Sequence, residues 1–267
     1  MTPRYIDAHC HLQFAPYDAD REVIMAQMRE QGVGAIVVGC DLESSQAALA
    51  LANKNENLYA AVGVHPNEIP KDVGHDMSDI RELAQQTKVV AIGECGLDYF
   101  RPSVVDEETK QKQKELFEKQ IALAAELDLP LIIHARPSKG SMDAYHDIAT
   151  MLAEAKQAHP NLRGDMHFFA GGVPEAEAFI ALGFTLSFTA VITFARDYDE
   201  VIRTVPLTSL LAETDAPYVA PASRRGQRND SLAVIDVATQ IAAIRGDDPE
   251  TVRAALLATT RRVFALP

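Results

Sequence analysis

The chain has 267 residues, a net charge of −13 at pH 7, and a composition that is 47% hydrophobic and 24% charged. These ordinary globular values exclude a disordered, collagen-like or coiled-coil chain, and the length suits one α/β barrel of about 250 residues. The acidic balance and the absence of tryptophan argue against a protein that holds nucleic acid by bulk electrostatics or by an extended stacking surface. They do not exclude a nuclease, because a bound cation can reverse the local sign of charge.

The sequence shows no sign of export or membrane insertion. No apolar run approaches the about 20 residues that cross a bilayer, and the first residues lead into an apparent strand instead of a signal peptide. The three cysteines, Cys10, Cys40 and Cys95, are too few and too odd in number for a disulfide framework. We therefore expect a cytoplasmic protein with no membrane contact and no obligate protein partner. Because no linker interrupts the chain, residues 1–267 are expected to form a single domain.

Short apolar runs bounded by Gly, Pro or polar residues recur along the whole chain. Such runs suit strands that are buried on both faces of a parallel sheet, although a short run can also belong to a buried helix. Their regular recurrence favours strands. The eight runs are Tyr5–Ala8, Ala35–Gly39, Leu58–Val64, Val89–Gly93, Leu131–Ile133, Gly164–Phe168, Phe184–Phe188 and Leu210–Ala212.

Helical patterns lie between these runs. In the stretch Lys110–Asp128, Phe117, Ile121 and Ala124 recur at a spacing of three or four, with Lys and Glu on the remaining faces. Strand followed by helix, eight times, predicts an α/β fold, a single (β/α)8 TIM barrel with an extra C-terminal helix. An open doubly wound sheet is the alternative. The other predicted helices are Asp20–Gln31, Ser44–Ala52, Glu175–Leu182, Ser231–Arg245 and Pro249–Phe264.

Histidines and carboxylates follow the predicted strands. In a barrel of this kind the chemistry lies at the C-terminal ends of the strands. Five of the eight histidines fall there, and His9 and His11 form a His-x-His pair whose side chains share one side of a strand. The residues at these ends are His9, His11, His65, Glu94, His134, His167 and Asp215.

Taken singly, each of these residues has an ordinary explanation, since a histidine near a strand end is more often hydrogen-bonded than a ligand. Groups of this kind gathered at one barrel mouth are best explained by bound cations, and the six without His65 exceed the ligands that one tetrahedral ion with an open position uses. We therefore predict two divalent ions that share a carboxylate. Zn, Mg, Mn, Ni and similar ions suit the set. Cys10 and Cys95 are interpreted as small buried thiols.

Five blocks of sequence resemble the TatD family of metal-dependent deoxyribonucleases, which belongs to the amidohydrolase superfamily. They occur in order over nearly the whole chain: Ile6–Leu12, Val64–Pro66, Ile92–Tyr99, Ile133–Arg136 and Glu213–Tyr218. The resemblance implies a TIM barrel, DNA phosphodiester hydrolysis, and His65 and Arg136 near the substrate. It also implies that Glu94 bridges two ions and that the ligands are His9, His11, Glu94, His134, His167 and Asp215.

Two segments depart from the family pattern. Where the family usually has His-Cys-Phe-Ser-Gly, residues 167–171 read His-Phe-Phe-Ala-Gly, and Arg228-Asn229-Asp230-Ser231 replaces Arg-Asn-Glu-Pro. The metal set is intact. The departures therefore bear on the identity of the substrate and not on metal-dependent hydrolysis.

A basic loop gives one further indication of the substrate. Residues 222–230, after the last predicted strand, carry three arginines in an otherwise acidic protein, and arginine forks suit phosphate. We predict that Arg225 and Arg228 contact the substrate. The alternative is a solvated loop in which an arginine pairs with Glu213 or Asp230.

The leading hypothesis is a two-metal nuclease that cleaves phosphodiester bonds of DNA, at single strands or ends, with exonuclease action as one form. Asp215 is expected to orient the attacking water and accept its proton, and Glu94 is expected to be the second catalytic residue. A binuclear amidohydrolase acting on a small amide, lactone or ester is the second hypothesis, and a metal-binding protein without catalysis is the third. Glu94 occupies the place where many binuclear members of the superfamily use a modified lysine, which favours the nuclease.

Overall fold

One parallel sheet forms the centre of the molecule. The computed structural model describes residues 2–69, 77–101 and 106–267. Its eight strands follow one another in chain order around the sheet, and every neighbouring pair is parallel. This sequential order confirms the predicted (β/α)8 barrel, since a doubly wound sheet reverses its strand order. The strands are β1 (Tyr5–Cys10), β2 (Val33–Val38), β3 (Leu58–Val62), β4 (Val89–Asp98), β5 (Leu131–Arg136), β6 (Gly164–His167), β7 (Thr185–Phe188) and β8 (Leu210–Ala212).

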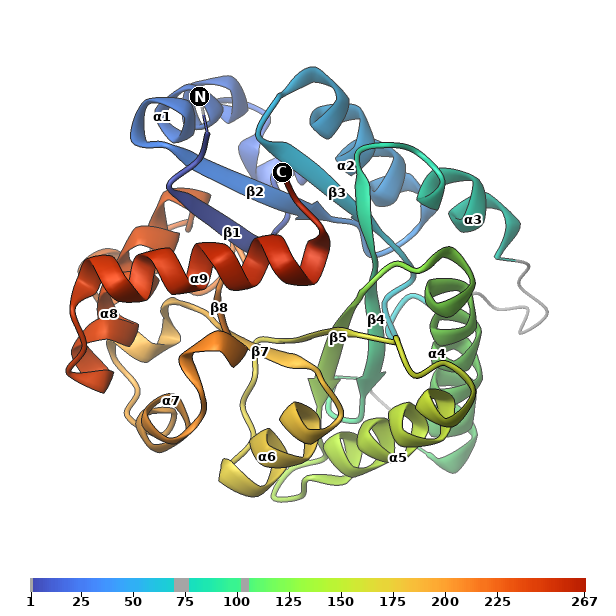
Figure 1. The fold of residues 1–267 in the computed structure, drawn as a ribbon. Helices are drawn as coiled ribbons and strands as arrows, with labels where there is room; N and C mark the ends of the chain where they lie inside the picture. Colours follow the sequence, from blue (N-terminus) through green and yellow to red (C-terminus); the bar gives the residue numbers. More distant parts are fainter. Residues whose placement is uncertain (1, 70–76, 102–105) are drawn as a thin grey trace.

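Helices connect successive strands and surround the sheet (Figure 1). The predicted ranges match α1, α2, α4, α6, α8 and α9, while α3, α5 and α7 are helices for which the sequence analysis names no range. α6 starts with Pro at its first turn, where the missing N–H costs nothing. The helices are α1 (Arg21–Gln31), α2 (Leu42–Lys54), α3 (Ser78–Ala84), α4 (Glu107–Leu127), α5 (Asp143–Ala158), α6 (Val173–Ala181), α7 (Asp199–Thr204), α8 (Val234–Arg245) and α9 (Pro249–Phe264).

The strands divide two hydrophobic cores between their faces. All six residues of β2 are buried, and they alternate: Ala35 and Val37 join the core between sheet and helices, while Ile36 and Val38 join the core inside the barrel. A strand buried on both faces reads as a continuous apolar run, which is why the sequence shows runs instead of alternation.

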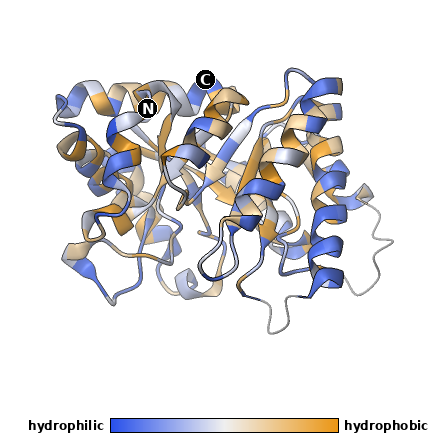
Figure 2. Cartoon of the chain, turned by 90° about the horizontal axis from the view of Figure 1, so that it is seen from below, coloured by the Kyte–Doolittle hydropathy of each residue, from blue (hydrophilic) through white to orange (hydrophobic). Residues whose placement is uncertain are grey.

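The C-terminal helix closes one end of the barrel. Val263, Phe264 and Leu266 are buried in the inner core beside strand residues such as Ile6. The Arg253 guanidinium donates a hydrogen bond to the carbonyl of Arg4, just before β1, so α9 covers the end where the strands begin. Both chain termini lie at that end (Figure 2). The opposite end, where the strands finish, is left for the site.

The barrel closes between its first and last strands just beyond β8. The Asp215 N–H donates to the His9 carbonyl at 2.9 Å, and the His11 N–H donates to the Ala216 carbonyl at 2.8 Å. The buried Asp7 carboxylate accepts hydrogen bonds from the Thr214 N–H at 2.9 Å and from the Thr214 hydroxyl at 2.6 Å. The segment that joins the two strands is therefore the segment that carries Asp215.

Several strands reach further toward the mouth than the apolar pattern predicts. That pattern ends at Gly93, whereas β4 runs to Asp98 and its end pairs with Arg136 of β5. Glu94 thus lies inside β4 and not beyond it, and β1 and β5 are extended in the same way. The cause is that polar side chains line the mouth while the backbone ladder continues.

In the described residues, no helix is long and apolar enough to cross a membrane.

Candidate metal centre

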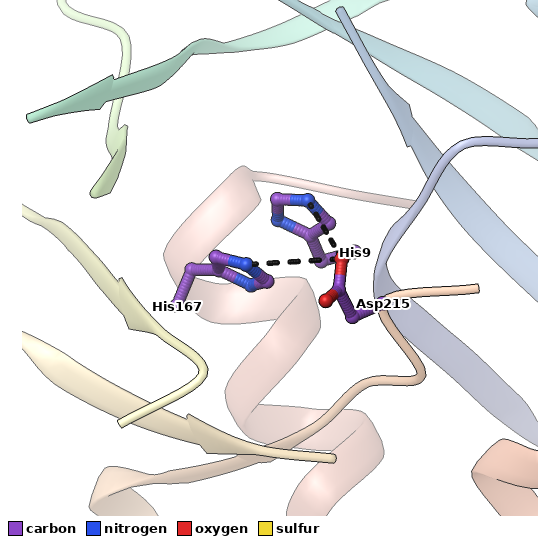
Figure 3. A group of neighbouring side chains, drawn as sticks. All are labelled: His9, His167 and Asp215. Atoms are coloured by element: carbon purple, nitrogen blue, oxygen red, sulfur yellow. Dashed lines mark ion pairs between the residues drawn. The ribbon is translucent and has the colours of Figure 1, made fainter. Parts of the chain in front are cut away.

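The predicted ligands converge at the C-terminal end of the barrel. Figure 3 shows His9, His167 and Asp215, which come from β1, β6 and the segment after β8. The Asp215 Oδ1 atom lies 4.0 Å from Nε2 of each of the two histidines. Their imidazole rings are stacked with centroids 3.5 Å apart. Residues about 200 positions apart in sequence therefore present ligand atoms to the same small space.

The His-x-His pair lies in this space as its spacing predicts. Nε2 of His9 and Nε2 of His11 are 3.2 Å apart, and both side chains are almost fully buried. The His11 Nε2 atom is also 3.5 Å from Oδ1 of Asp215. The Nδ1–H of His11 donates to the Val38 carbonyl at 2.8 Å, so that Nε2 keeps its lone pair. Lone pairs that face one another at this distance suit a shared cation.

Glu94 lies at the centre of the cluster and turns its two oxygens toward different histidines. Oε2 is 3.6 Å from Nε2 of His9 and 3.9 Å from Nε2 of His11. Oε1 is 3.0 Å from Nδ1 of His134 and 3.5 Å from Nε2 of His65. Three groups with metal-ligand spacing result: His9, His11 and Glu94; His9, His167 and Asp215; His65, Glu94 and His134. The first two share His9, and the third shares only Glu94 with the first.

Two buried carboxylates hold the ligand imidazoles from behind. The Nδ1–H of His167 donates to Glu213 at 2.9 Å, and the Nε2–H of His134 donates to Asp98 at 3.1 Å. Metal-binding histidines usually donate their other N–H to such an acceptor, which fixes the tautomer and the ring orientation. The donor set of this structure therefore fits divalent cations.

From the sequence, Glu213 is named only as an alternative partner of a loop arginine and Asp98 has no role, although both stand in the quoted motifs. Glu213 also accepts hydrogen bonds from the Phe168 N–H at 2.7 Å and from the Ser187 hydroxyl at 2.7 Å. The strand period of two could have found Asp98, which follows Glu94 by four residues within β4 and lies on the same face. Glu213 and Asp215 lie beyond the end of β8, where this period gives no signal.

Burial and charge determine the protonation of the centre. Burial opposes ionisation of Glu94, but the surrounding imidazoles, His65 first among them, hold its pKa well below the usual range. Burial lowers the pKa of His65 to about 4, so its imidazole is neutral at pH 7. Although burial opposes it, neighbouring acidic groups raise the pKa of His11, His134 and His167, that of His167 to about 9, so a cation that binds these imidazoles would displace protons from them.

His65, expected near the substrate, lies among the candidate metal ligands. Besides its contact with Glu94, its ring is 4.5 Å from that of His134, between centroids. Cys40, which the sequence analysis treats only in the cysteine count, donates a weak hydrogen bond from its thiol to Glu94 at 3.7 Å. All three cysteines are free, and Cys10 and Cys95 are buried.

Two arginines of the basic loop are bound to carboxylates. Arg228 forms a two-pronged ion pair with Asp20, with N–O distances of 2.9 and 2.5 Å. Arg224 pairs with Asp230 at 2.6 Å, which is the alternative interpretation of the loop for that residue. Substrate contact by Arg228 stays a prediction, and it requires the ion pair with Asp20 to open.

Two other arginines lie over aromatic rings. The Arg225 guanidinium is 3.8 Å from the centroid of the Phe194 ring, and the Arg136 guanidinium is 4.3 Å from that of Phe100. Neither arginine forms an ion pair with any residue that the structure describes. Both guanidinium groups therefore keep donors for an anionic ligand.

A barrel with five histidines and two carboxylates at the ends of its strands defines a class, that of barrel hydrolases built around divalent metal. Comparison with known proteins gives the family. The family model described as TatD related DNase matches residues 6–265, and the chain belongs to that family.

Named relatives agree with this assignment. The chain is 36% identical to the Bacillus subtilis protein named uncharacterized metal-dependent hydrolase YabD, over 97% of this chain and 98% of the relative. It is 32% identical to the 3'-5' ssDNA/RNA exonuclease TatD of Erwinia tasmaniensis, over 97% and 99%. The crystal structure of YJJV, a TatD homolog from Escherichia coli, matches with a TM-score of 0.88 at 32% identity and covers 100% of both chains. The chain is thus a metal-dependent hydrolase of the TatD family.

Proposed function

We propose that this chain, as one domain, hydrolyses phosphodiester bonds of DNA with two divalent ions held on either side of Glu94. The observation that carries the proposal is the orientation of that carboxylate, whose Oε2 faces His9 and His11 while Oε1 faces His134 and His65. One carboxylate between two sets of imidazoles is the arrangement of a two-ion centre.

The residues on the two sides divide into two ligand sets. His9, His11 and Asp215 would hold one ion with Oε2 of Glu94, and His134 would hold the other with Oε1. His167 lies within 4.0 Å of both carboxylates, and His65 lies within 3.5 Å of Glu94. When bound, divalent ions lower the pKa of the attacking water and offset the charge of the phosphate.

The chain's own residues supply the proton transfer and the phosphate contacts. The Asp215 side chain is 14% exposed, more than that of Glu94 at 5%, and it therefore meets water entering the mouth. It orients that water and accepts its proton. Arg136 and Arg225 hold the phosphate and balance the charge that develops on it. The relative from Erwinia tasmaniensis, named a 3'-5' ssDNA/RNA exonuclease, supports a single-stranded substrate and exonuclease action.

The test begins with the metal. Purified protein is stripped with a chelator and reloaded separately with Zn, Mg, Mn, Co or Ni, and ions per chain are counted. Each form is then assayed on end-labelled single-stranded DNA, on duplex DNA, and on a panel of lactones and cyclic amides. We expect two ions per chain and cleavage of single-stranded DNA that disappears on chelation and returns with metal.

Variants on the two sides of Glu94 separate the two ligand sets. His11→Ala and His134→Ala should each lower the metal content from two ions to one while circular dichroism reports a folded barrel. Two ions retained in both variants would contradict the assignment. Turnover of a lactone or amide with no cleavage of any DNA would favour the amidohydrolase instead.

A further inference from the structure

Two aromatic side chains at the mouth are exposed without an evident structural reason. Among the described residues, the exposed large hydrophobic side chains are Val23 at 58%, Phe100 at 50% and Tyr218 at 50%. Val23 lies on α1, which flanks the barrel wall. Phe100 follows the end of β4, which carries Glu94, and Tyr218 follows Asp215 in the segment after β8. An exposed aromatic ring beside a reaction centre indicates a ligand with a face to stack on.

Phe100 is attached to the same anchor as a ligand histidine. Its N–H donates to Oδ1 of Asp98 at 3.0 Å, while Oδ2 of Asp98 accepts from His134. The guanidinium of Arg136 covers one face of the Phe100 ring at 4.3 Å. The Phe100 ring and the Arg136 guanidinium therefore lie together near His134, on the side of the centre that Oε1 of Glu94 faces. The hydrogen bond to Asp98 holds the backbone of Phe100 in place.

Tyr218 has the corresponding position on the other side. Its N–H donates to the carbonyl of Asp215 at 2.9 Å, and its ring centroid lies 6.3 Å from that of His11, with the ring planes at 70°. The two aromatic residues are thus each tied by a backbone hydrogen bond to a residue that ligates or that holds a ligand.

The order of the strands places these two rings across the mouth from each other. Phe100 and its partner Arg136 follow β4 and β5, whereas Tyr218 follows β8 and lies beside His11 at the end of β1. In a barrel of eight strands in sequential order, the β4–β5 wall faces the β8–β1 wall. Glu94 and Asp215 lie between them. A phosphodiester at the centre would carry one nucleoside toward each wall.

We propose that Phe100 and Tyr218 are base-stacking platforms for the two nucleotides that flank the scissile phosphate, and that they select unpaired nucleic acid. The proposal rests on the proposed function and names its substrate class. Unpaired bases offer free π-faces to aromatic side chains, whereas the bases of a duplex are already stacked on one another. Two isolated rings, instead of an extended platform, suit a chain with only 6% aromatic residues.

The experiment compares two substrates that differ only in their bases. One is a single-stranded oligothymidylate, and the other has abasic tetrahydrofuran residues in place of the two nucleotides that flank the cleaved bond. Phe100→Ala and Tyr218→Ala are each compared with Phe100→Tyr and Tyr218→Phe, which keep a ring. Val23→Ala is the matched control, since it removes an exposed apolar side chain away from the mouth.

We expect each alanine variant to raise KM for the oligothymidylate by about 5- to 150-fold, the range for loss of one stacked base, with a smaller change in kcat. The same variants should leave KM for the abasic strand unchanged, because no base is present to stack. The ring-keeping variants and Val23→Ala should behave as wild type. Tm should not change, since both side chains are exposed.

Two results would overturn the proposal in distinguishable ways. Equal KM values of the wild type for the two strands, or equal effects of the alanine variants on both, would overturn base stacking and leave the nuclease function intact. No cleavage of either strand by the metal-loaded wild type would overturn the nuclease function together with the stacking proposal.

Discussion

Asp215 combines a proposed ligand position with an unusual backbone conformation. Its φ is +52°, in the left-handed region that aspartate tolerates better than most residues, and its N–H is bound to the His9 carbonyl. This conformation turns the chain after β8 so that the carboxylate reaches within 3.5 Å of His11. The position of Asp215 alone does not distinguish a metal ligand from a general base. One substitution separates these two roles.

We expect Asp215→Asn to lower kcat by about 10²- to 10⁴-fold while most of the metal stays bound. Asparagine still offers a carbonyl oxygen to a cation, but it cannot accept a proton from water at neutral pH. Metal content, Tm and kcat are measured on the same preparation. Loss of an ion, with the rate restored by added metal, would show that Asp215 acts chiefly as a ligand. Near wild-type kcat in a fully loaded variant would remove it from the mechanism.

We expect Glu213 to act on a bound metal through another residue, His167. Its carboxylate accepts from three donors, the imidazole of His167, the Phe168 N–H and the Ser187 hydroxyl. A glutamine in its place must turn an NH2 group toward one of these donors. The ring of His167 then loses its fixed tautomer and its Nε2 lone pair is no longer secured.

We therefore expect Glu213→Gln to weaken binding of one ion by about 10- to 100-fold, measured by competition with a chelating dye. Asp98→Asn is the matched variant on the other side, where the carboxylate holds His134. A purely structural role for Glu213 would lower Tm and leave the metal affinity of the folded protein unchanged.

At the level of elements, the apolar runs predict the strands well where both faces are packed and poorly where one end faces the mouth. β8 matches its run, Leu210–Ala212, because both of its faces are covered. β4 exceeds its run by five residues, Glu94 to Asp98, because the polar residues Glu94 and Asp98 interrupt the apolar pattern while Cys95 and Leu97 still pack in the core. The ligand residues break the pattern by which the strand is recognised. The polar residues that serve the site therefore make the ends of the strands that carry them hard to predict from the sequence.

The loop that leads from β5 into α5 depends on an ionised carboxylate. Asp143 accepts hydrogen bonds from the Ser138 N–H at 2.9 Å and the Ser138 hydroxyl at 2.7 Å, and it pairs with Lys110 at 3.2 Å. Burial alone would raise its pKa, but these donors, Ser138 before Lys110, lower the pKa to about 2. The folded state thus binds the proton less tightly than the unfolded chain.

The direction of the pH dependence follows from this difference in proton affinity between the folded and unfolded states. The stabilisation is fully present above about pH 4, the ordinary pKa of aspartate, and is lost as the pH falls toward 2. Because the group is partly exposed, we expect Asp143→Asn to cost only about 1 kcal/mol at pH 7. The unfolding free energies of wild type and variant should converge between pH 4 and 2 in urea titrations. A constant difference over that interval would show that ionisation of Asp143 is not the cause.

For the molecule as a whole, the sequence predicts which histidines and carboxylates gather at the centre but not what surrounds them. The histidines and carboxylates can be found because each stands at the end of a strand, and strand ends meet in a barrel. The ion pair of Arg228 with Asp20 joins residues 208 positions apart, and no local pattern indicates it. The same holds for the positions of Phe100 and Tyr218, which require the order of strands around the barrel.

Because α9 closes the end of the barrel opposite the ligands, we expect its buried side chains to contribute to stability and not to catalysis. Phe264 is 2% exposed within the inner core, at the end opposite the ligands. We expect Phe264→Ala to lower the free energy of unfolding by about 3–5 kcal/mol, measured by urea denaturation. Leu257→Ala, at a partly buried position packed against the same core, should cost less. Turnover per folded molecule should stay at the wild-type level, and a large fall in kcat would show that the two ends of the barrel are coupled.

A cation bound where β1 meets the segment after β8 would have a second role, because it would stabilise the folded barrel. His9 and His11 lie on one side of this join and Asp215 on the other, so an ion that binds all three ties the first strand to the last across 200 residues of chain. Such an ion binds the native state and not the unfolded one, and at 100 times its Kd it would add about 2.7 kcal/mol to the stability of the barrel. We expect Tm to rise with metal concentration and to fall on chelation. The cell's supply of the ion would then govern not only the rate of this enzyme but also how long each folded copy survives.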